Sequence, residues 1–456
     1  MFSAFANSFK IKELRQRIFV ALGIVALTRI AANIPCPGVD LKALSEYFKD
    51  LKGSDTAAGG FLGMFDLFTG GAIHNFAVAT LGIMPYISAS IIMQLLMPVI
   101  PSLEKMVREG ESGRQKLTQY TRYLTVLICI IQGTMAAIAM IDPSRLGMQQ
   151  AAQPLVIIQN KYIFVPITVI MLTAGTMFIM WLGEQITKYG IGNGASLIIT
   201  VNIVARMPSS FYALYDMAKS GGVTTGIPFK PVHLFLLLLI FVVVTAATIV
   251  LTQGQRKIPI QMAKRIVGFN KMAGGSTYIP LKVNFSGVMP IIFASAILMF
   301  PQMILAYIPL DFVRNLVPYF SHGHPVYMLF YGILILVMSY FWVANMFNPL
   351  QVAENLKREG AFIPGIRPGK PTAEFLDHTM TKITFAGAIF LTFLALFPTF
   401  LYKGLGIPYM VASFFGGTSL LIIVGVMLDT LSQMESHLLM RNYDGFLKRG
   451  KLKGRR

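Results

Sequence analysis

The residues of this chain best suited to chemistry are arginines and lysines grouped in two long polar segments. The segment 253–286 carries six basic residues and neither Asp nor Glu, and 348–382 carries five basic residues among glycines and prolines. Such side chains bind acidic partners or anionic lipid headgroups. Their chemistry is therefore recognition rather than bond making. The candidate docking residues are Arg256, Lys257, Lys264, Arg265, Lys357, Arg358 and Arg367.

Catalytic signatures are missing from the sequence. It contains no G-x-x-x-x-G-K-[ST] phosphate loop, no H-E-x-x-H zinc motif and no G-x-S-x-G nucleophile elbow. The Gly-rich run at 365–370 has the wrong spacing for a phosphate loop. Cys36 and Cys129 are far apart in the sequence and indicate neither a disulfide framework nor a metal site. We expect no enzymatic activity, no cofactor and no metal.

Long apolar runs must position the two basic segments. Of 456 residues, 55% are apolar and 13% charged, whereas soluble domains have about a quarter charged. Nine runs are long enough to cross a bilayer, and a weaker tenth at about 195–215 is interrupted by Arg206 and Pro208. The nine lie at roughly 18–34, 77–97, 123–141, 162–183, 231–252, 287–310, 325–347, 383–402 and 407–428. The sequence predicts an all-α membrane protein, with the first run retained as a span rather than cleaved as a signal peptide.

The distribution of basic residues predicts the orientation of the spans. Of 39 Lys and Arg residues, 28 lie in the two tails and one alternating set of polar segments, and 10 lie in the opposite set. The last, Arg29, lies inside an apolar run. Cytoplasmic segments collect Lys and Arg. Because both tails are basic, the number of spans is even, so we expect ten spans with both termini cytoplasmic.

The spans divide evenly around an external segment at 216–230. Five spans precede it, in an N-terminal half at 1–215, and five follow, in a C-terminal half at 231–433 that leads to a basic tail at 434–456. This layout is compatible with two pseudo-symmetric halves, as in many transport folds. A further apolar run at 61–73 is too short to cross. It is either an interfacial helix or a segment that enters a channel.

The spans contain few ionisable residues. Such residues usually mark ion or proton paths, and here Arg29 and Asp429 both lie near span ends, where snorkelling or local pairing explains them. The absence of a carboxylate at mid-span speaks against an ion-coupled pump. Instead the spans hold Ser, Thr, Gly and Gln, which permit close helix packing and suit helices that separate without stranding a charge.

Ordered motifs identify a resemblance to the SecY family of protein-conducting channels, of the bacterial type. The similarity extends from about residue 13 to the end of the chain. Its motifs are ATLGIMPYISASII at 79–92, EGESGR at 109–114, MWLGEQIT at 180–187, GIGNG at 190–194, PLKVN at 280–284, FIPGIRPG at 362–369 and FGGTSLLI at 415–422. The resemblance implies a ten-helix clamshell in two halves around an hourglass pore.

The resemblance also implies roles for individual residues. A ring of aliphatic side chains would exclude water when closed and mould around a passing chain, and its positions are Ile83, Ile87, Ala195, Ile199, Ile292 and Ile422. Ala195 is smaller than the bulky aliphatic residue usual there. The run at 61–73 would be the plug, centred on Asp66, Leu67, Phe68, Thr69, Gly70, Gly71 and Ala72. A lateral gate would open between spans two and three and spans seven and eight, with a polar seam of Ser88, Ser90 and Gln94.

The implied function is passage of unfolded preproteins across the bacterial plasma membrane and sideways release of membrane helices. The implied partners are the SecE and SecG subunits, the motor ATPase SecA, the ribosome, preprotein and signal-peptide clients, and anionic lipids. A separate motor would explain why the chain has no ATP site. Two other interpretations remain open: a secondary transporter for a small solute, and a membrane-anchored scaffold that binds nucleic acid or lipid.

Overall fold

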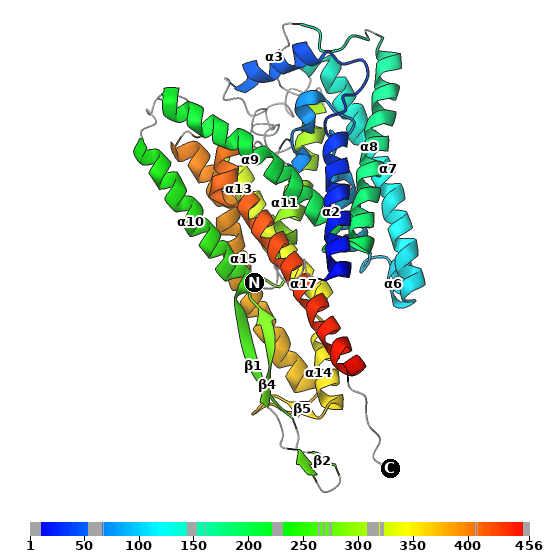
Figure 1. The fold of residues 1–456 in the computed structure, drawn as a ribbon, viewed down its shortest axis with the longest axis vertical. Coiled ribbons are helices and arrows are strands. Elements are labelled where there is room, and N and C mark those ends of the chain that lie inside the picture. The colour runs from blue at the N-terminus through cyan, green and yellow to red at the C-terminus, as the bar shows by residue number, and fades with distance from the viewer. Residues whose placement is uncertain are drawn as a thin grey trace. The chain divides into compact units, whose positions relative to one another are not determined.

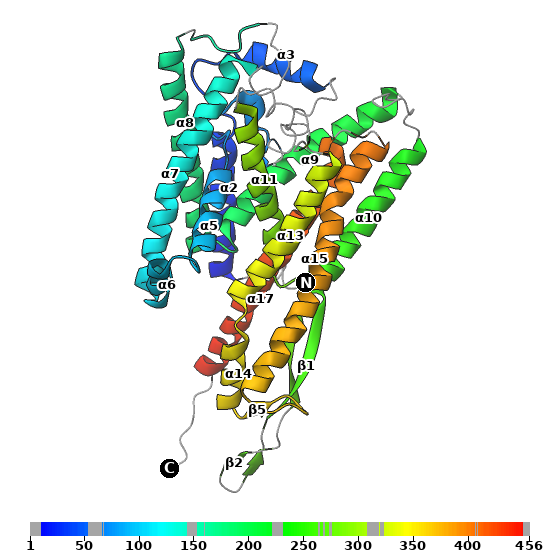
Figure 2. The ribbon, with the colours of Figure 1, turned by 180° about the vertical axis from the view of Figure 1, so that it is seen from behind.

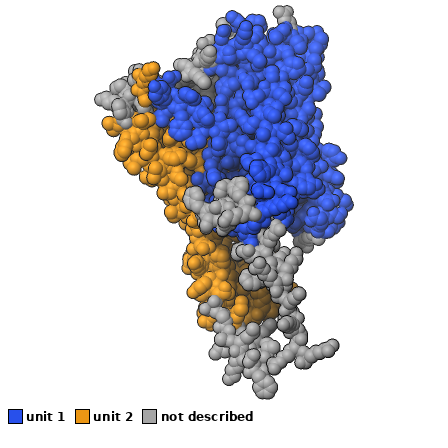
Figure 3. All heavy atoms as spheres, in the orientation of Figure 1, with its two compact units in different colours: residues 1–216, 299–322, 422–456 blue, residues 217–298, 323–421 orange. Residues whose placement is uncertain are grey.

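The structure is a computed structural model in which two compact units are distinguished. It describes residues 11–52, 66, 68–143, 153–158, 160–220, 231–262, 265–267, 270–272, 276–307, 319, 323–405, 407 and 409–449. Unit 1 comprises 1–216, 299–322 and 422–456, and unit 2 comprises 217–298 and 323–421 (Figure 3). The division of the chain into functional halves at 216–230 stays a prediction.

Helices dominate both units (Figures 1 and 2). Among the described residues, seven helices are long and apolar enough to cross a membrane. They are α7 (Glu111–Ile141), α8 (Lys161–Tyr189), α9 (Gly194–Ser220), α10 (Pro231–Gln253), α13 (Pro325–Met346), α15 (Lys370–Leu405) and α17 (Thr418–Arg449). An eighth candidate is a pair, α5 (Met84–Leu96) and α6 (Pro101–Arg108), bent by 103°. The predicted class of helical membrane protein is confirmed, and the weak tenth run is helical in α9. The total of ten stays a prediction.

Two other predicted spans coincide with α2 (Lys12–Ala31) and α11 (Met289–Tyr307). The run at 77–97 differs from its prediction, because residues 78–83 form turns and α5 begins only at Met84, with Pro85 in the first helical turn. Proline is tolerated there because its missing N–H has no partner to lose. The run at 407–428 also differs, since Gly417 separates α16 (Tyr409–Gly416) from α17. Gly417 has a φ of +135°, and a Cβ there would lie 2.8 Å from the carbonyl oxygen of Leu394.

In unit 1, α7 and α8 pack along each other around a buried core that includes Cys129, Ala137, Phe164 and Leu172. The amphipathic helix α3 (Leu41–Lys52) contributes Leu44 and Tyr47 to the same core and packs on the short helix η1 (Ala72–Asn75). A separate cluster joins α2 to α17 through Leu14, Ile18, Ile191 and Met434. These contacts hold together helices that lie beside residues 68–83.

Unit 2 carries the described part of the basic segment 253–286 as a β-hairpin. Strand β1 (Gln255–Met262) pairs antiparallel with β4 (Ser276–Lys282), and β2 (Arg265–Val267) pairs with β3 (Asn270–Met272). Partly alternating polarity at 256–265, followed by Gly274-Gly275, predicts a protruding hairpin here, and the pairing of β1 with β4 confirms it. On its other edge β1 pairs with β5 (Ala361–Phe362), which follows α14 (Pro349–Arg358) in the second basic segment. Ile258, Leu281, Leu376 and Met380 anchor this sheet on α15.

Several helices expose large apolar side chains. On α10 these include Val232, Phe235, Leu238 and Val250, each at least 60% exposed. A water-facing helix would carry polar side chains at such positions. The exposed apolar surface therefore fits helices in a hydrocarbon environment.

Candidate functional site

The described part of the short run predicted at 61–73 lies beside helices of unit 1. Residues 61–65 and Leu67 lie outside the described residues. Asp66, Phe68 and Thr69 are helical and buried. Gly70 and Gly71 then turn the chain with φ values of +64° and +96°, and η1 follows. Left-handed backbone of this kind favours glycine. The described part of the run is thus too irregular to be a membrane-crossing helix.

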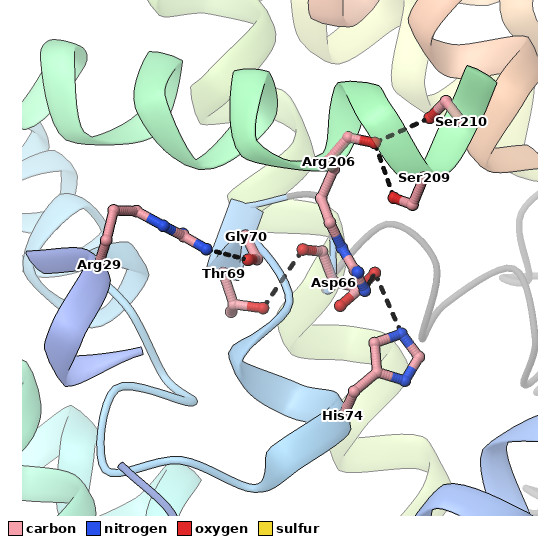
Figure 4. A network of polar contacts seen from close by, with 8 residues as sticks. All are labelled: Arg29, Asp66, Thr69, Gly70, His74, Arg206, Ser209 and Ser210. Carbon is pink, nitrogen blue, oxygen red and sulfur yellow. Dashed lines mark hydrogen bonds and ion pairs between the residues drawn. The ribbon is translucent and has the colours of Figure 1, made fainter. Parts of the chain in front are cut away.

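The carboxylate of Asp66 is held by a cation from α9. Arg206 donates from Nη2 to Oδ2 of Asp66, and the side chains are 16% and 8% exposed (Figure 4). On the same oxygen, Nε2 of His74 lies 3.4 Å away, on η1. Asp66 and Arg206 form a buried ion pair, and a charge buried to this degree needs such a partner. Arg206, which weakens the apolar run at 195–215, is therefore a functional candidate.

Arg29 and Asn202 bind the backbone of the same segment, and together with Arg206 they form a clamp on it. Arg29 of α2 donates from Nη2 to the carbonyl oxygen of Gly70 at 2.8 Å (Figure 4) and from Nη1 to Oδ1 of Asn202 at 3.1 Å. Asn202 of α9 donates from Nδ2 to the carbonyl oxygen of Phe68 at 2.9 Å. Two neighbouring carbonyls of the segment are thus held from two helices. Arg29 pairs locally, as one interpretation of the sequence allowed.

Helix α9 is continuous beside the clamp, although it contains Pro208. The hydroxyls of Ser209 and Ser210 donate to the carbonyl oxygen of Arg206 at 2.8 and 3.2 Å (Figure 4). Proline removes one backbone donor from a helix, and such side-chain bonds occupy backbone carbonyls locally. The two serines therefore satisfy a backbone carbonyl in the helical turn that carries Arg206.

The end of the segment is tied to the chain after α2. The N–H of Cys36 donates to the carbonyl oxygen of Phe76 at 2.9 Å, and the N–H of Val78 donates to that of Ile34 at 2.8 Å. Thr80 donates through Oγ1 to the carbonyl oxygen of Ala77 at 2.6 Å. Burial raises the pKa of the Cys36 thiol to about 12. The thiol is therefore neutral near pH 7, and Cys36 acts as a small apolar core residue.

Glycine 175 lets the turn after the segment approach α8. A Cβ at Gly175 would overlap the carbonyl oxygen of Val78. We expect Gly175→Ala to displace the turn and destabilise the protein by about 1–3 kcal/mol, the usual cost of overpacking. Gly23→Ala on α2 is the matched control, because a Cβ there meets nothing within 4 Å. Thermal unfolding of the purified protein in detergent measures both, and equal melting temperatures would contradict the role of Gly175.

The predicted pore-ring residues are mostly buried. Ile83 and Ile87 lie at the start of α5, and Ile199 lies on α9. A Cβ at Gly183 would lie 3.5 Å from Cδ1 of Ile83 and 3.7 Å from the backbone nitrogen of Ala195, so both flank Gly183. Ile292 lies in unit 2, and Ile422 begins the last part of unit 1; both are buried. The assembly of the six into one ring stays a prediction.

The predicted gate residues all lie on α5, and two of them form a polar pair. Gln94 donates from Nε2 to Oγ of Ser90 at 3.1 Å, one helical turn away. Ser88 is buried and points elsewhere, because two residues along a helix correspond to a rotation of about 200°. The structure therefore places Ser90 and Gln94 in one polar pair. The role of all three in a gate stays a prediction.

The two basic segments meet in one sheet, which the sequence did not predict. Gln261 of β1 pairs with Phe362 of β5, so the segments share the order β4-β1-β5. Arg256 and Lys257 are exposed on β1, and Lys357 and Arg358 are exposed at the end of α14. Arg265 lies on β2, whereas Lys264 lies outside the described residues. Both basic segments therefore contribute to one β-sheet within unit 2.

Arg367 projects from a shaped turn after β5. Gly365 and Gly369 flank it with φ values of +84° and +105°. The buried hydroxyl of Thr372 donates to the carbonyl oxygen of Arg367 at 2.8 Å, and Ile363 and Ile366 anchor the turn in the core under the sheet. The Arg367 side chain itself is exposed. An exposed cation on an anchored turn can bind a partner with little loss of backbone entropy.

Arg29, Asn202, Arg206 and His74 are the site residues that sequence reasoning missed. The available signal was the rarity of ionisable side chains in apolar runs, since these usually have a partner and a function. Arg29 was noted for its position and Arg206 as an interruption. Their partners lie 41 and 140 residues away in the chain, so local patterns do not reveal them.

The fold and sites define a multi-pass helical membrane protein with a clamped, irregular segment in one unit and a basic β-sheet in the other. The SecY family model matches residues 77–431, and the chain belongs to that family. It is 41% identical to the protein translocase subunit SecY of Chlamydia muridarum over 98% of both chains. It is also 44% identical to that of Streptomyces griseus, over 98% of this chain and 100% of the relative.

Solved structures show the same fold. One described as a protein-conducting channel aligns with a TM-score of 0.60 and 17% identity, over 96% of this chain and 95% of that chain. Sec61 in the canine ribosome-channel complex aligns with a TM-score of 0.57 and 14% identity, over the same shares of the two chains. These likenesses confirm the helical channel fold expected from the sequence.

Proposed function

We propose that this chain is the channel-forming subunit of a bacterial protein translocase. In this function it passes unfolded preproteins across the plasma membrane and releases membrane helices sideways into lipid. The observation that carries the proposal is the family match over residues 77–431, together with relatives named as translocase subunits along almost the whole chain. The alternative of a small-solute transporter receives no support from these relatives, which are named for protein translocation.

Reconstitution tests the proposal directly. The chain, with the SecE and SecG subunits, is placed in vesicles and supplied with SecA, ATP and a preprotein. We expect the preprotein to become protected from added protease until detergent opens the vesicles. A lack of protection, with SecA that hydrolyses ATP normally, would contradict the proposal.

The basic sheet of unit 2 is the proposed docking surface for SecA and the ribosome. Two features support it: the exposed cations on β1 and after α14, and the anchored turn that carries Arg367. Ribosomal RNA and acidic protein surfaces are partners of matching charge. Anionic lipids would interact with the remaining cytoplasmic cations. Both termini would then be cytoplasmic, because the tails belong to the same alternating set of basic polar segments in the sequence.

The segment at 66–72 is the proposed plug, and the six aliphatic positions are the proposed ring. Together they would keep ions from leaking while no chain passes. A narrow aliphatic constriction blocks ions because water leaves it. The clamp of Arg29, Asn202 and Arg206 supports this role, because it holds Asp66, Phe68 and Gly70 in a buried position.

We expect Ile87→Ser combined with Ile292→Ser to raise ion conductance severalfold, because hydroxyls let water wet the constriction. Conductance of the purified complex in planar bilayers, without SecA, provides the measurement. Ile333→Ser, on an exposed face of α13, is the matched control and should change nothing. Wild-type conductance in the double variant would remove both residues from the ring.

A further inference from the structure

We propose that Arg29 and Arg206 form a cationic pair that selects among passing chains, favouring acidic segments over basic ones. The inference rests on the proposed function, because it concerns the state in which the segment at 66–72 has moved aside. The two side chains come from α2 and α9, and both face that segment (Figure 4).

The two guanidinium groups lie on consecutive residues of the segment. A Cβ at Gly70 would meet Nη1 of Arg29 at 2.5 Å, and a Cβ at Gly71 would meet Cζ of Arg206 at 3.2 Å. Both groups carry a positive charge, so they repel each other. The two arginines therefore form one local concentration of positive charge.

The negative charge that offsets this pair belongs to the segment itself. Asp66 is the carboxylate bound to Arg206, whereas the hydrogen bonds of Arg29 go to the neutral oxygens of Gly70 and Asn202. Neither α2 nor α9 has a carboxylate within seven residues of Arg29 or Arg206 in the sequence. The remaining ionisable groups of these helices stand near the helix ends.

Movement of the segment therefore changes the charge balance. Asp66 and the carbonyl of Gly70 would leave together, while both arginines stay on their helices. Arg206 would then lack its carboxylate acceptor, and Arg29 would keep only its bond to Asn202. The net charge around the two arginines would rise by one, because the carboxylate of Asp66 has left. A passing chain can supply the missing acceptors through its own carboxylates, whereas its lysines and arginines would be repelled.

The test compares three preproteins that differ only in one block of the mature part: four lysines, four glutamines or four glutamates. Translocation is followed in vesicles carrying the whole complex with SecA and ATP. In the wild type we expect the lysine block to pass more slowly than the glutamine block. The double variant Asp66→Asn with Arg206→Gln removes both charges of the ion pair. The lysine-to-glutamine rate ratio should then rise about fivefold, because this factor corresponds to the interaction energy of two unit charges in close contact in water. Arg29→Gln should raise it similarly.

Lys161→Gln is the matched control, because Lys161 is an exposed cation at the start of α8. It should leave the ratio as in the wild type. An unchanged ratio in both arginine variants would overturn the proposal. Failure of the wild type to protect any of the three preproteins would instead overturn the proposed function.

A second measurement uses the wild type alone, so it does not depend on how well a variant folds. The vesicle lumen is loaded with salt at about 0.01 M or about 1 M, which shortens the Debye length from about 30 to about 3 Å. Sucrose balances the osmotic pressure. We expect the lysine-to-glutamine ratio to approach one at high lumenal salt. A ratio that does not depend on lumenal salt would overturn the proposal.

Discussion

Replacing Arg206 with glutamine will raise the resting ion conductance of the channel about a hundredfold or more. Asp66 would keep its charge in a buried position, where its side chain is 8% exposed, and would lose its guanidinium partner. Removing one partner of a buried ion pair costs about 3–5 kcal/mol. If that cost falls on the closed state alone, the population of the open state rises by about two decades or more. Conductance of the purified complex in planar bilayers, without SecA, measures this change.

The double variant Asp66→Asn with Arg206→Gln distinguishes the charge from the shape of the pair. Two amides can still form a hydrogen bond, and no charge is left buried, so we expect conductance to fall back toward that of the wild type. Lys161→Gln, which changes an exposed cation on α8, should leave conductance unchanged. If the Arg206→Gln channel has the same resting conductance as the wild type, the ion pair does not hold the channel closed.

Replacing Arg367 with glutamate will lower SecA-driven export about tenfold or more while the complex stays assembled. The side chain is exposed, so the change leaves no buried charge behind, and the turn keeps its bond from Thr372 to the backbone of residue 367. An arginine at the centre of a protein interface often contributes about 2 kcal/mol or more to binding. Reversal of its charge adds repulsion from the acidic partner. Protease protection of a preprotein gives the export rate, and co-purification of SecE and SecG reports assembly.

Lys382→Glu is the matched control for this experiment. Lys382 is also basic and exposed, but it lies on α15, more than three turns beyond the start of that helix. The same charge change there should reduce export much less. Equal effects of the two changes would point to overall charge rather than docking at the turn. Unaltered export by the Arg367→Glu complex would contradict the docking assignment.

Local properties of the sequence predicted the class of the protein and many of its elements. Hydropathy over about 20 residues reveals a span because the bilayer has a fixed thickness. The weak run at 195–215 was counted because two basic tails require an even number of spans, and α9 occupies it. The hairpin at 253–286 followed from partly alternating polarity and a Gly-Gly turn, and β1 and β4 confirm it. Apart from the number of spans, each prediction depended on residues that are neighbours in the chain.

Element boundaries were predicted less well where glycine and proline interrupt an apolar run. Hydropathy does not register the backbone turns at 78–83 or the break at Gly417, because the residues remain apolar on both sides. Two close approaches also escaped notice: Val78 against Gly175, and Leu394 against Gly417. A missing Cβ has meaning only when the neighbouring backbone is known.

The sequence by itself determined the helical membrane class, the segregation of basic residues and, through its ordered motifs, the SecY family. Tertiary structure alone decided the partners of the polar residues. Arg29 reaches Asn202 across 173 residues, Asn202 reaches Phe68 across 134, and the two basic segments share a sheet through β1 and β5. The physical reason is that burial makes an unpaired charge or carbonyl costly. That cost requires a partner near Arg29 and Arg206, but only the packing of α2 and α9 around residues 66–72 determines which partner it is.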